Sequence, residues 1–407
     1  MARRTSSTSW RPGQLRHPVL VSLLAIAASV LPVFLTGALS VQLRASLSFG
    51  TATLGLLVAV FFLAAVAGSL VAGPIAERWR AGTVLRCATA TSATCLAAVA
   101  LAVHSPIALA VVLAFAGVAN GVLQPSVNAY LVHAVRPGRQ GLAFGLRQSA
   151  IPLSTLLGGL AVPALALTVG WRFAYGAAAL LAAATVALLP PPSAAPPPER
   201  RSGAAAAGRV ALAPLAVLAL GAGLGAGAAN ALGSFLVPGA VAAHVPAGLA
   251  GGLAAGGSCC GMASRIAVGA RADRRDGGHL RVVAAMLALG AGGYLLLATG
   301  RPLLLVPGTA LAFAAGWGWN GLLNFAVARS HPRAPARATA ITQAGVFAGS
   351  VAVPIAFGLL VGHTSYRAGW LLAAGLVLAA AAVVAVGRRL LAAAVSPAEV
   401  TAPASRP

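Results

Sequence analysis

Amide side chains recur at helical spacing in the long apolar stretches of this 407-residue sequence. Asn120, Gln124 and Asn128 are four residues apart, so a helix would carry them on one face. Such a face could orient a small ligand with hydrogen-bond donors and acceptors. Alternatively, the amides could bond neighbouring helices to one another. The pattern recurs later in the chain, which favours a ligand cavity. The candidates are Asn120, Gln124, Asn128, Gln148, Asn230, Trp317, Asn320, Asn324 and Gln343.

Arg147 precedes Gln148 near the start of another apolar stretch. If a helix begins near residue 142, this guanidinium lies within the membrane, where it could bind an anionic substrate such as a carboxylate through two parallel hydrogen bonds. The alternative is a side chain that extends to the lipid headgroups. The corresponding position of the second half, Thr342, is uncharged, which favours a functional role for Arg147.

Acidic residues are rare, and none of the five lies in an apolar stretch: Glu77, Glu199, Asp273, Asp276 and Glu399. Proton relays in membranes use ionisable groups inside the bundle, and cationic ligands favour a carboxylate there. A neutral or anionic solute is therefore favoured over a cationic one. The four cysteines lack the spacing of metal ligands. We expect no metal site, no cofactor and no catalytic residue.

Membrane-spanning helices must position these side chains, because apolar types make up 59% of the chain and charged types only 8%. In a soluble protein about a quarter of the residues are charged, so this chain is too poor in charge to be one. A disordered chain would be poor in apolar residues, so disorder is excluded as well. A span needs about 20 apolar residues. The sequence predicts an all-α integral membrane protein with twelve spans, near residues 19–41, 51–73, 83–103, 106–130, 142–169, 172–189, 210–237, 247–268, 280–299, 303–328, 337–361 and 367–387. The eighth is the least hydrophobic because of its many glycines.

The net charge of +23 comes from 28 arginines, and their distribution excludes a nucleic-acid binder, which would gather charge on one face or in one tract. With both termini in the cytoplasm, only four arginines fall in external loops: Arg44, Arg172, Arg301 and Arg367. This is a strong positive-inside signal. We expect a multi-pass protein of the plasma or inner membrane, whose first span is retained and not cleaved as a signal peptide.

A proline-rich stretch divides the chain into two halves that match each other. The predicted organisation is a cytoplasmic tail (1–18), a first six-helix bundle (19–189), a cytoplasmic linker (190–209), a second six-helix bundle (210–387) and a cytoplasmic tail (388–407). Asn120-Gly121 matches Asn320-Gly321, and Trp171-Arg172 matches Tyr366-Arg367. Two pseudo-symmetric bundles are the architecture of secondary transporters.

The sequence resembles the major facilitator superfamily over essentially its whole length. The family's loop motif GxLADRxGRR stands here as Gly73 to Arg80, with Glu77 in place of Asp and Arg80 in place of a glycine. A second copy runs from Arg265 through Gly269 to Arg275. The family's antiporter signature, which ends in GPxxGG, is incomplete, because five residues separate Pro152 from Gly158-Gly159.

The resemblance implies a conformational latch at the cytoplasmic ends of the helices. Acids and arginines there can bond the two bundles to each other, and to helix ends, in one conformation. The latch residues implied by the motif are Glu77, Arg78, Arg265, Asp273 and Arg274. The alternative is that the arginines of both loops only fix the orientation of the chain in the membrane, and that one acid in each loop partly offsets their positive charge.

These observations predict a transporter that moves a small organic solute, neutral or anionic, by alternating access. We expect a monomer whose partners are the solute and the lipid bilayer. The alternative within the family is a proton-coupled drug or metabolite efflux antiporter. An integral-membrane enzyme would need clustered histidines and acids near the interface, which the sequence lacks, and a two-bundle repeat suits rocking better than a channel pore.

Overall fold

The computed structural model describes residues 16–135, 145–189, 211–272, 277–331 and 334–395, and within these ranges the regular structure is entirely helical. The helices of the first half are α1 (Arg16–Ala38), α2 (Ser40–Leu47), α3 (Thr51–Arg78), α4 (Ala81–Ala102), α5 (Pro106–Ala134), α7 (Ala150–Ala161) with the π-helical η3 (Val162–Ala166), and α8 (Trp171–Leu188). Those of the second half are α9 (Leu212–Ala242), α10 (Ala247–Ala272), α11 (His279–Ala298), α12 (Pro302–Leu311) with the π-helical η5 (Ala312–Gly316) and α13 (Asn320–Ser330), α14 (Pro335–His363) and α15 (Tyr366–Val395).

Local sequence signals set several helix boundaries. Ser105 caps α5 by accepting a hydrogen bond from the main-chain N–H of Ala108 at 3.1 Å, and Pro106 occupies the first turn, where its missing N–H costs nothing. Prolines also begin α12 and α14. Gly170, at φ +104°, makes the turn into α8 in a backbone conformation that favours glycine.

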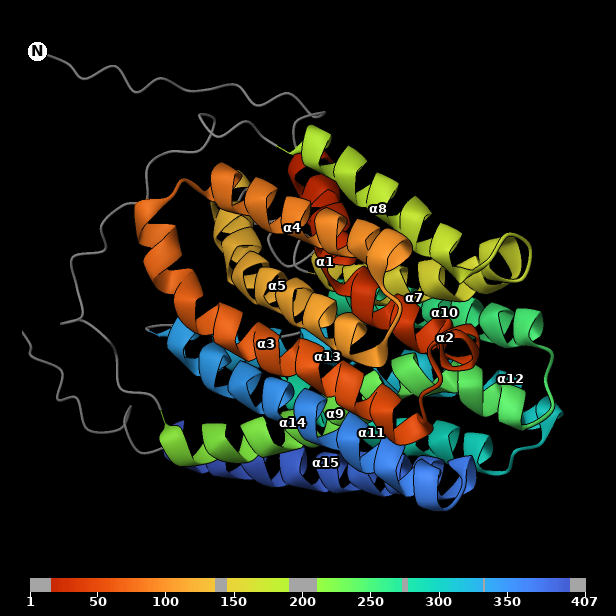
Figure 1. The fold of residues 1–407 in the computed structure, drawn as a ribbon. Coiled ribbons are helices and arrows are strands. Elements are labelled where there is room, and N and C mark those ends of the chain that lie inside the picture. The colour runs from red at the N-terminus through yellow and green to blue at the C-terminus, as the bar shows by residue number, and fades with distance from the viewer. Residues whose placement is uncertain (1–15, 136–144, 190–210, 273–276, 332–333, 396–407) are drawn as a thin grey trace, which may run out of the picture.

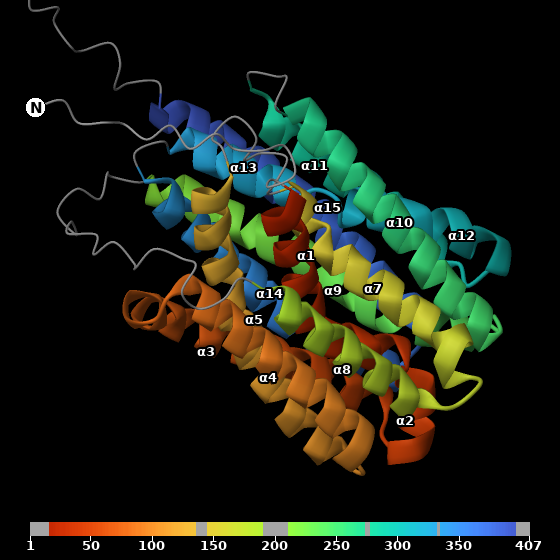
Figure 2. The same cartoon turned by 90° about the horizontal axis from the view of Figure 1, so that it is seen from above.

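The two halves form two groups of helices that lie side by side (Figures 1 and 2). They meet along three seams, α3 with α14, α7 with α10, and α1 with α9. We call the end of the bundle that holds the connection between α3 and α4 the Arg78 end, and the opposite end, where α2 leads into α3, the Thr51 end. The expected all-α fold in two six-helix bundles is confirmed; the linker at 190–209 lies outside the described residues.

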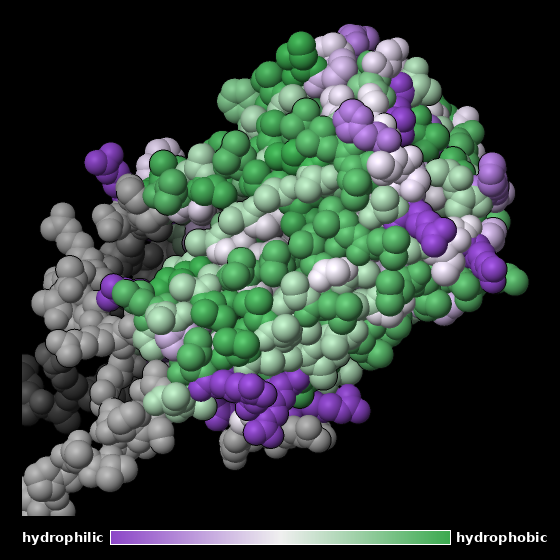
Figure 3. Space-filling view, turned by 90° about the horizontal axis from the view of Figure 1, so that it is seen from below, coloured by the Kyte–Doolittle hydropathy of each residue, from purple (hydrophilic) through white to green (hydrophobic). Residues whose placement is uncertain are grey.

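The sides of the bundle are apolar. Leu101, Ile107 and Leu303 are each more than three-quarters exposed, and the face shown in Figure 3 is green over most of its middle, with purple patches toward its margins. Among the described helices, eleven are long and apolar enough to span a membrane. The eighth predicted span, α10, is not one of these eleven, although its 26 residues are long enough to cross.

Some boundaries differ from the sequence-based expectation. The first predicted span breaks near Leu39, and the short α2 follows it at the Thr51 end. Helix α15 continues to Val395, past the expected end at residue 387. Pro307 lies inside α12, and the chain then passes through η5 before α13. This π-helical segment lies directly before Trp317. Short π-helical segments of this kind are frequent at functional sites.

Candidate functional site

Arg147 lies in the interior of the first half, in the helical segment before α7, and only 6% of its surface is exposed. Its guanidinium donates hydrogen bonds to the side-chain oxygen of Gln124 on α5 and to the side-chain oxygen of Gln148, the latter at 3.2 Å. A longer bond, 3.4 Å, reaches the main-chain oxygen of Gln124. The Nε of Arg147 has no hydrogen-bond partner among the described residues. The side chain therefore does not extend to the surface; it is held inside by neutral oxygens.

Arg265 lies on α10, on the other side of the α7–α10 seam. It is 5% exposed on α10 and donates one hydrogen bond to the main-chain oxygen of Gln148 and another, at 3.0 Å, to that of Trp317. Its guanidinium carbon lies 5.9 Å from the centroid of the Trp317 ring, within range of a cation–π interaction. Its Nε, too, has no partner among the described residues.

Gln148 thus joins two buried cations that come from opposite halves. Its side-chain oxygen accepts from Arg147 and its main-chain oxygen from Arg265. The described side chains include no carboxylate, so both guanidiniums are bound there by neutral acceptors only. Burying a charge without a counter-charge is costly. Two unsatisfied Nε–H donors and two forked guanidiniums form a site in which an anion can be bound.

The polar network continues into the first half. Gln124 donates to the side-chain oxygen of Asn120 at 3.3 Å, and Ser29 of α1 donates to the same oxygen at 3.0 Å. The hydrogen bonds therefore run without a break from Ser29 through Asn120, Gln124, Arg147 and Gln148 to Arg265. This chain crosses the bundle from α1 to α10.

An aromatic wall closes the site on its apolar side. Trp317 packs edge-on against Phe34 of α1, with ring centroids 5.6 Å apart, and its ring centroid lies 5.5 Å from that of Phe313. Gly233 of α9 leaves room for this contact, because a Cβ there would lie 2.8 Å from the Phe34 ring and 2.9 Å from the Trp317 ring. The wall contains residues from both halves, as the polar network does.

The remaining amides predicted for the cavity lie in other surroundings. Asn230 donates to Ser350 at 2.8 Å and to the main-chain oxygen of Ala226, so it connects α9 to α14 within the second half. Asn324 donates to the side-chain oxygen of Asn320 at 3.4 Å. The side-chain oxygen of Asn128 is buried without a partner among the described residues, and Gln343 is half-buried on α14.

The predicted latch lies largely outside the described part of the chain. Asp273, Arg274 and the side chain of Glu77 are not described, and Arg78 lies at the end of α3. Arg265 does bond the opposite half, but through the main chain of Gln148 inside the bundle.

Ser29 is a member of the network that the sequence analysis did not single out. Ser22, Ser29 and Thr36 recur every seven residues on α1, and all three are fully buried. That spacing places the three side chains on one face of the helix. The seven-residue repeat of hydroxyl side chains is the sequence signal from which Ser29 could have been predicted.

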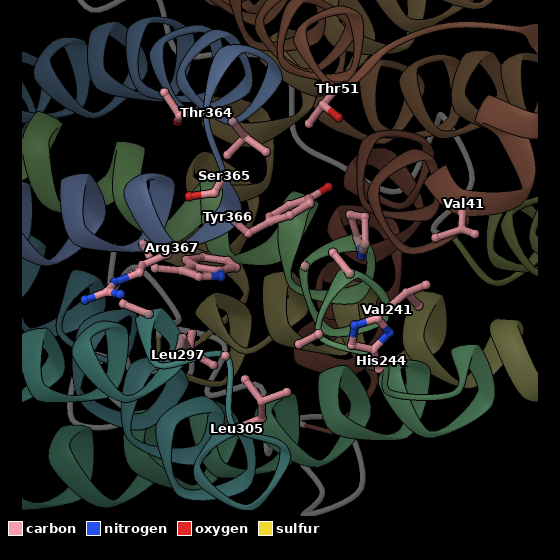
Figure 4. Close-up of a pocket in the computed structure, with 18 of the residues that line it drawn as sticks. Val41, Thr51, Val241, His244, Leu297, Leu305, Thr364, Ser365, Tyr366 and Arg367 are labelled. Atoms are coloured by element: carbon pink, nitrogen blue, oxygen red, sulfur yellow. The ribbon is translucent and has the colours of Figure 1, made fainter.

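A cavity of about 960 Å³ lies at the Thr51 end and is lined by both halves (Figure 4). Arg44 of the first half and Arg367, His244 and Tyr366 of the second are among its lining residues. Arg44 also donates to the main-chain oxygen of Phe49 at 3.3 Å. No acid is among the described residues that line this cavity, so their permanent charges are those of the two arginines. No cluster of potential metal ligands occurs in the described part of the chain.

Comparison with known proteins identifies relatives of this architecture. A family model described as Major Facilitator Superfamily matches residues 20–280. Among solved structures, a D-xylose–proton symporter superposes with a TM-score of 0.72 at 15% identity, covering 90% of this chain and 96% of the symporter. An inward-facing, unoccupied bacterial homologue of the human lysosomal transporter Spinster gives 0.69 at 15% identity, covering 95% of this chain and 99% of that one.

A mutant of the nucleoside transporter NupG gives a TM-score of 0.67 at 17% identity, covering 90% of this chain and 99% of that one. No curated protein matches the chain. At these sequence identities, the similarity to solved structures supports the fold alone.

Proposed function

This chain belongs to the major facilitator superfamily, and on that premise we propose that it carries a small organic anion across a membrane by alternating access. The observation that carries the proposal is the pair of buried arginines, one from each half, bound only by neutral oxygens among the described residues. A carboxylate or phosphate supplies the charge and the paired acceptor oxygens that a guanidinium binds best.

The network gives each half a direct part in binding. Arg147, held by Gln124, presents its guanidinium from the first half, and Arg265 presents one from the second. The Trp317–Phe34 wall supplies an apolar surface for the carbon skeleton of the solute. A ligand bound by both halves is affected directly when the bundles rock, which is what alternating access requires.

The three seams between the halves are tightly packed toward the Thr51 end. Cβ atoms added at Gly159 and Gly37 would lie 2.6 Å from the Gly251 oxygen and the Ser234 Cα, respectively, and one at Gly55 would overlap the Pro354 oxygen. We propose that the Thr51 end faces outward and is closed in this arrangement. The arginine distribution supports this orientation, because the positive-inside rule favours a cytoplasmic location for the Arg78 end.

The test is uptake into liposomes containing the purified protein, with labelled lactate, succinate, inorganic phosphate and neutral sorbitol. We expect uptake of at least one anion and a loss of about tenfold or more in Arg147→Gln, since about 1.4 kcal/mol of lost binding has that effect. Arg281→Gln is the matched control, because Arg281 is exposed at the start of α11. Sorbitol uptake that is equal in wild type and Arg147→Gln, without anion uptake, would refute the proposal.

The same assay distinguishes the proton-coupled efflux antiporter. An antiporter of that kind would stop when an uncoupler removes a pH gradient. The carrier proposed here has no described carboxylate in its interior to bind the proton. We therefore expect anion uptake to continue at an unchanged initial rate when the pH gradient is removed.

A further inference from the structure

We propose that the cavity at the Thr51 end is a binding site of its own, which takes a small organic anion with an aromatic or aliphatic body, and that an anion bound there holds this end closed. Its volume of about 960 Å³ is that of a site for a small molecule. No member of the network from Ser29 to Arg265 is among its described lining residues. The binding site does not depend on the proposed function, whereas its effect on transport rests on it.

The apolar part of the cavity is an aromatic wall in the second half. Trp370 of α15 is 3% exposed, and its ring centroid lies 4.9 Å from that of Phe357 and 6.4 Å from that of Tyr294. Gly239 of α9 leaves room for the wall, because a Cβ there would lie 3.2 Å from the Trp370 ring and 3.1 Å from the Tyr366 ring. Packing on several sides holds these rings in place, so they offer a fixed apolar surface to the body of a ligand.

The polar part of the cavity is cationic. Arg44 of α2 is half-buried, donates from Nε to the main-chain oxygen of Phe49 at 3.3 Å, and lies beside the hydroxyl of Tyr366. Arg367 adds a second positive charge at the exposed rim, and His244 offers ring nitrogens that can form hydrogen bonds. A guanidinium beside an aromatic wall suits a ligand whose carboxylate binds the arginine while its hydrocarbon part lies on the rings.

The five acids of the chain are attached at the other end of the bundle. Glu77 lies in the last turn of α3, about 39 Å along the helix axis from its first residue. The other four lie in segments that connect or extend helices at the Arg78 end: Glu199 between α8 and α9, Asp273 and Asp276 between α10 and α11, and Glu399 after α15. The membrane-spanning length of the helices therefore separates the attachment points of the acids from the cavity. Charge complementarity thus favours an anionic ligand there.

The cavity is open to the solution at the Thr51 end. His244, Thr364, Ser365 and Arg367, which line it, are all exposed, and Figure 4 shows them around the same space as Leu297 and Leu305. A ligand can therefore enter from this side without opening the seams between the halves.

A ligand in this cavity contacts both halves. Arg44 and Phe49 belong to the first half, and Tyr366 and Trp370 to the second. Separating the halves at this end moves the arginine away from the aromatic wall, so a ligand that touches both binds the closed arrangement more tightly. By linkage, the bound ligand opposes opening. Added on the side of the Thr51 end, it should therefore slow transport.

Isothermal titration calorimetry of the purified protein tests the site without transport. The probes are 2-naphthoate and its neutral counterpart 2-naphthamide, each at equal concentration of detergent in cell and syringe. We expect one equivalent of 2-naphthoate to bind, with about tenfold weaker binding of 2-naphthamide and of 2-naphthoate to Arg44→Gln. Arg301→Gln, which removes a charge at the same end outside the cavity, is the control and should bind as wild type does. Equal affinity for both compounds, or an unchanged affinity in Arg44→Gln, would overturn the proposal.

Two neighbouring residues of α2 test the location of the site. Ala45 is exposed and lines the cavity, whereas Ser46 is exposed and does not line it. Ala45→Trp should fill part of the cavity and weaken 2-naphthoate binding about tenfold or more, and Ser46→Trp should leave it unchanged. Because both native side chains are exposed, neither variant disturbs the core. Wild-type affinity in both variants would show that 2-naphthoate binds elsewhere and would overturn the site.

Transport tests the effect of the bound ligand. In vesicles of defined orientation, 2-naphthoate on the side of the Thr51 end, at about ten times its Kd, should lower the maximal rate of uptake of a carried anion about fivefold or more. Excess carried anion should not restore the rate, and Arg44→Gln should be inhibited less. Inhibition that excess carried anion removes would place 2-naphthoate at the Arg147 site and overturn the proposed closure. If no anion is carried at all, the proposed function fails, while the calorimetric result still decides the binding site.

Discussion

Gln148 is a neutral residue between two buried cations, and the site depends on its two oxygens in different ways. The main-chain oxygen, which accepts from Arg265, is present whatever the side chain is. The side-chain oxygen, which accepts from Arg147, is specific to glutamine or another acceptor of the same length. Replacing the side chain therefore tests one half of the contact and leaves the other in place.

Gln148→Leu keeps the approximate volume and removes the acceptor at Arg147. A hydrogen bond to a charged group contributes about 1.5–3 kcal/mol, so we expect the empty protein to lose stability of this order. Thermal unfolding in detergent should show a lower midpoint that recovers when a transported anion is added, since the anion supplies the missing acceptor. Gln343→Leu, on the half-buried face of α14, is the control and should show no anion-dependent recovery. A midpoint equal to that of wild type without anion would contradict this role of Gln148.

Residue types and spacing predicted part of this site. The sequence shows that Arg147 begins an apolar stretch and that Asn120 and Gln124 are four residues apart. The structure joins all three in one network. The motif assigns Arg265 to the latch because this residue begins the second copy of the loop motif, whereas its helix places it inside the bundle. Asn230 was grouped with the cavity, but its partner Ser350 could not be known without the packing of α9 on α14.

At the scale of elements, small residues decide how closely the halves approach. Gly251 of α10 and Gly159 of α7 lie in backbone contact, so Gly251→Val would place side-chain atoms inside α7. We expect this variant to keep the Thr51 end from closing and to lower the rate of anion uptake into liposomes. Gly252→Val is the matched control, because a Cβ at this neighbouring position meets no atom within 4 Å.

The distance between spin labels measures the same closure directly. Cysteines introduced at Ser46 on α2 and at Thr364 after α14 would be exposed at the Thr51 end on opposite halves, as the native side chains are. With the native cysteines replaced, Gly251→Val should give a longer mean distance between the labels than wild type, and Gly252→Val the wild-type distance. Identical distances in all three proteins would show that the glycine contact does not control closure.

Hydropathy predicted the existence of the helices better than their details. The apolar stretches match the described spans because a helix is the only open-ended structure that satisfies its backbone in lipid. Helix α10 is the least hydrophobic of the predicted spans, and Gly251, one of the glycines that lower its hydropathy, also allows its contact with α7. The break near Leu39 that separates α2 from α1 has no strong sequence signal, because no side chain caps the start of α2. The extension of α15 to Val395 was missed because the chain becomes more polar there while the helix continues.

At the scale of the whole molecule, the described charged side chains lie outside the interior, except for those of the candidate site. Among the described residues, Arg147 and Arg265 are the buried arginines, whereas the others lie toward the two ends of the bundle. The matched halves bring one of these cations from each side although the repeat does not place an arginine at corresponding positions. The twofold architecture was predictable from repeated motifs; the meeting of two non-equivalent arginines required the three-dimensional packing of α7 against α10.

The cavity at the Thr51 end extends this charge pattern toward the solution that we propose is external. Arg44 and Arg367 line it and no acid is among its described lining residues, so an anion that approaches this end is attracted before it reaches the site. Arg367→Gln should therefore raise the KM for external anion uptake about twofold to fivefold at about 10 mM salt, and much less at about 300 mM, where the screening length is shorter. Uptake of anion by vesicles of defined orientation measures the KM at both salt concentrations.

Arg301→Gln is the control. It removes the same charge from an exposed position at the same end, but Arg301 does not line the cavity, so the KM should be nearly unchanged. If the two variants respond equally to salt, the attraction belongs to the surface as a whole and not to this cavity.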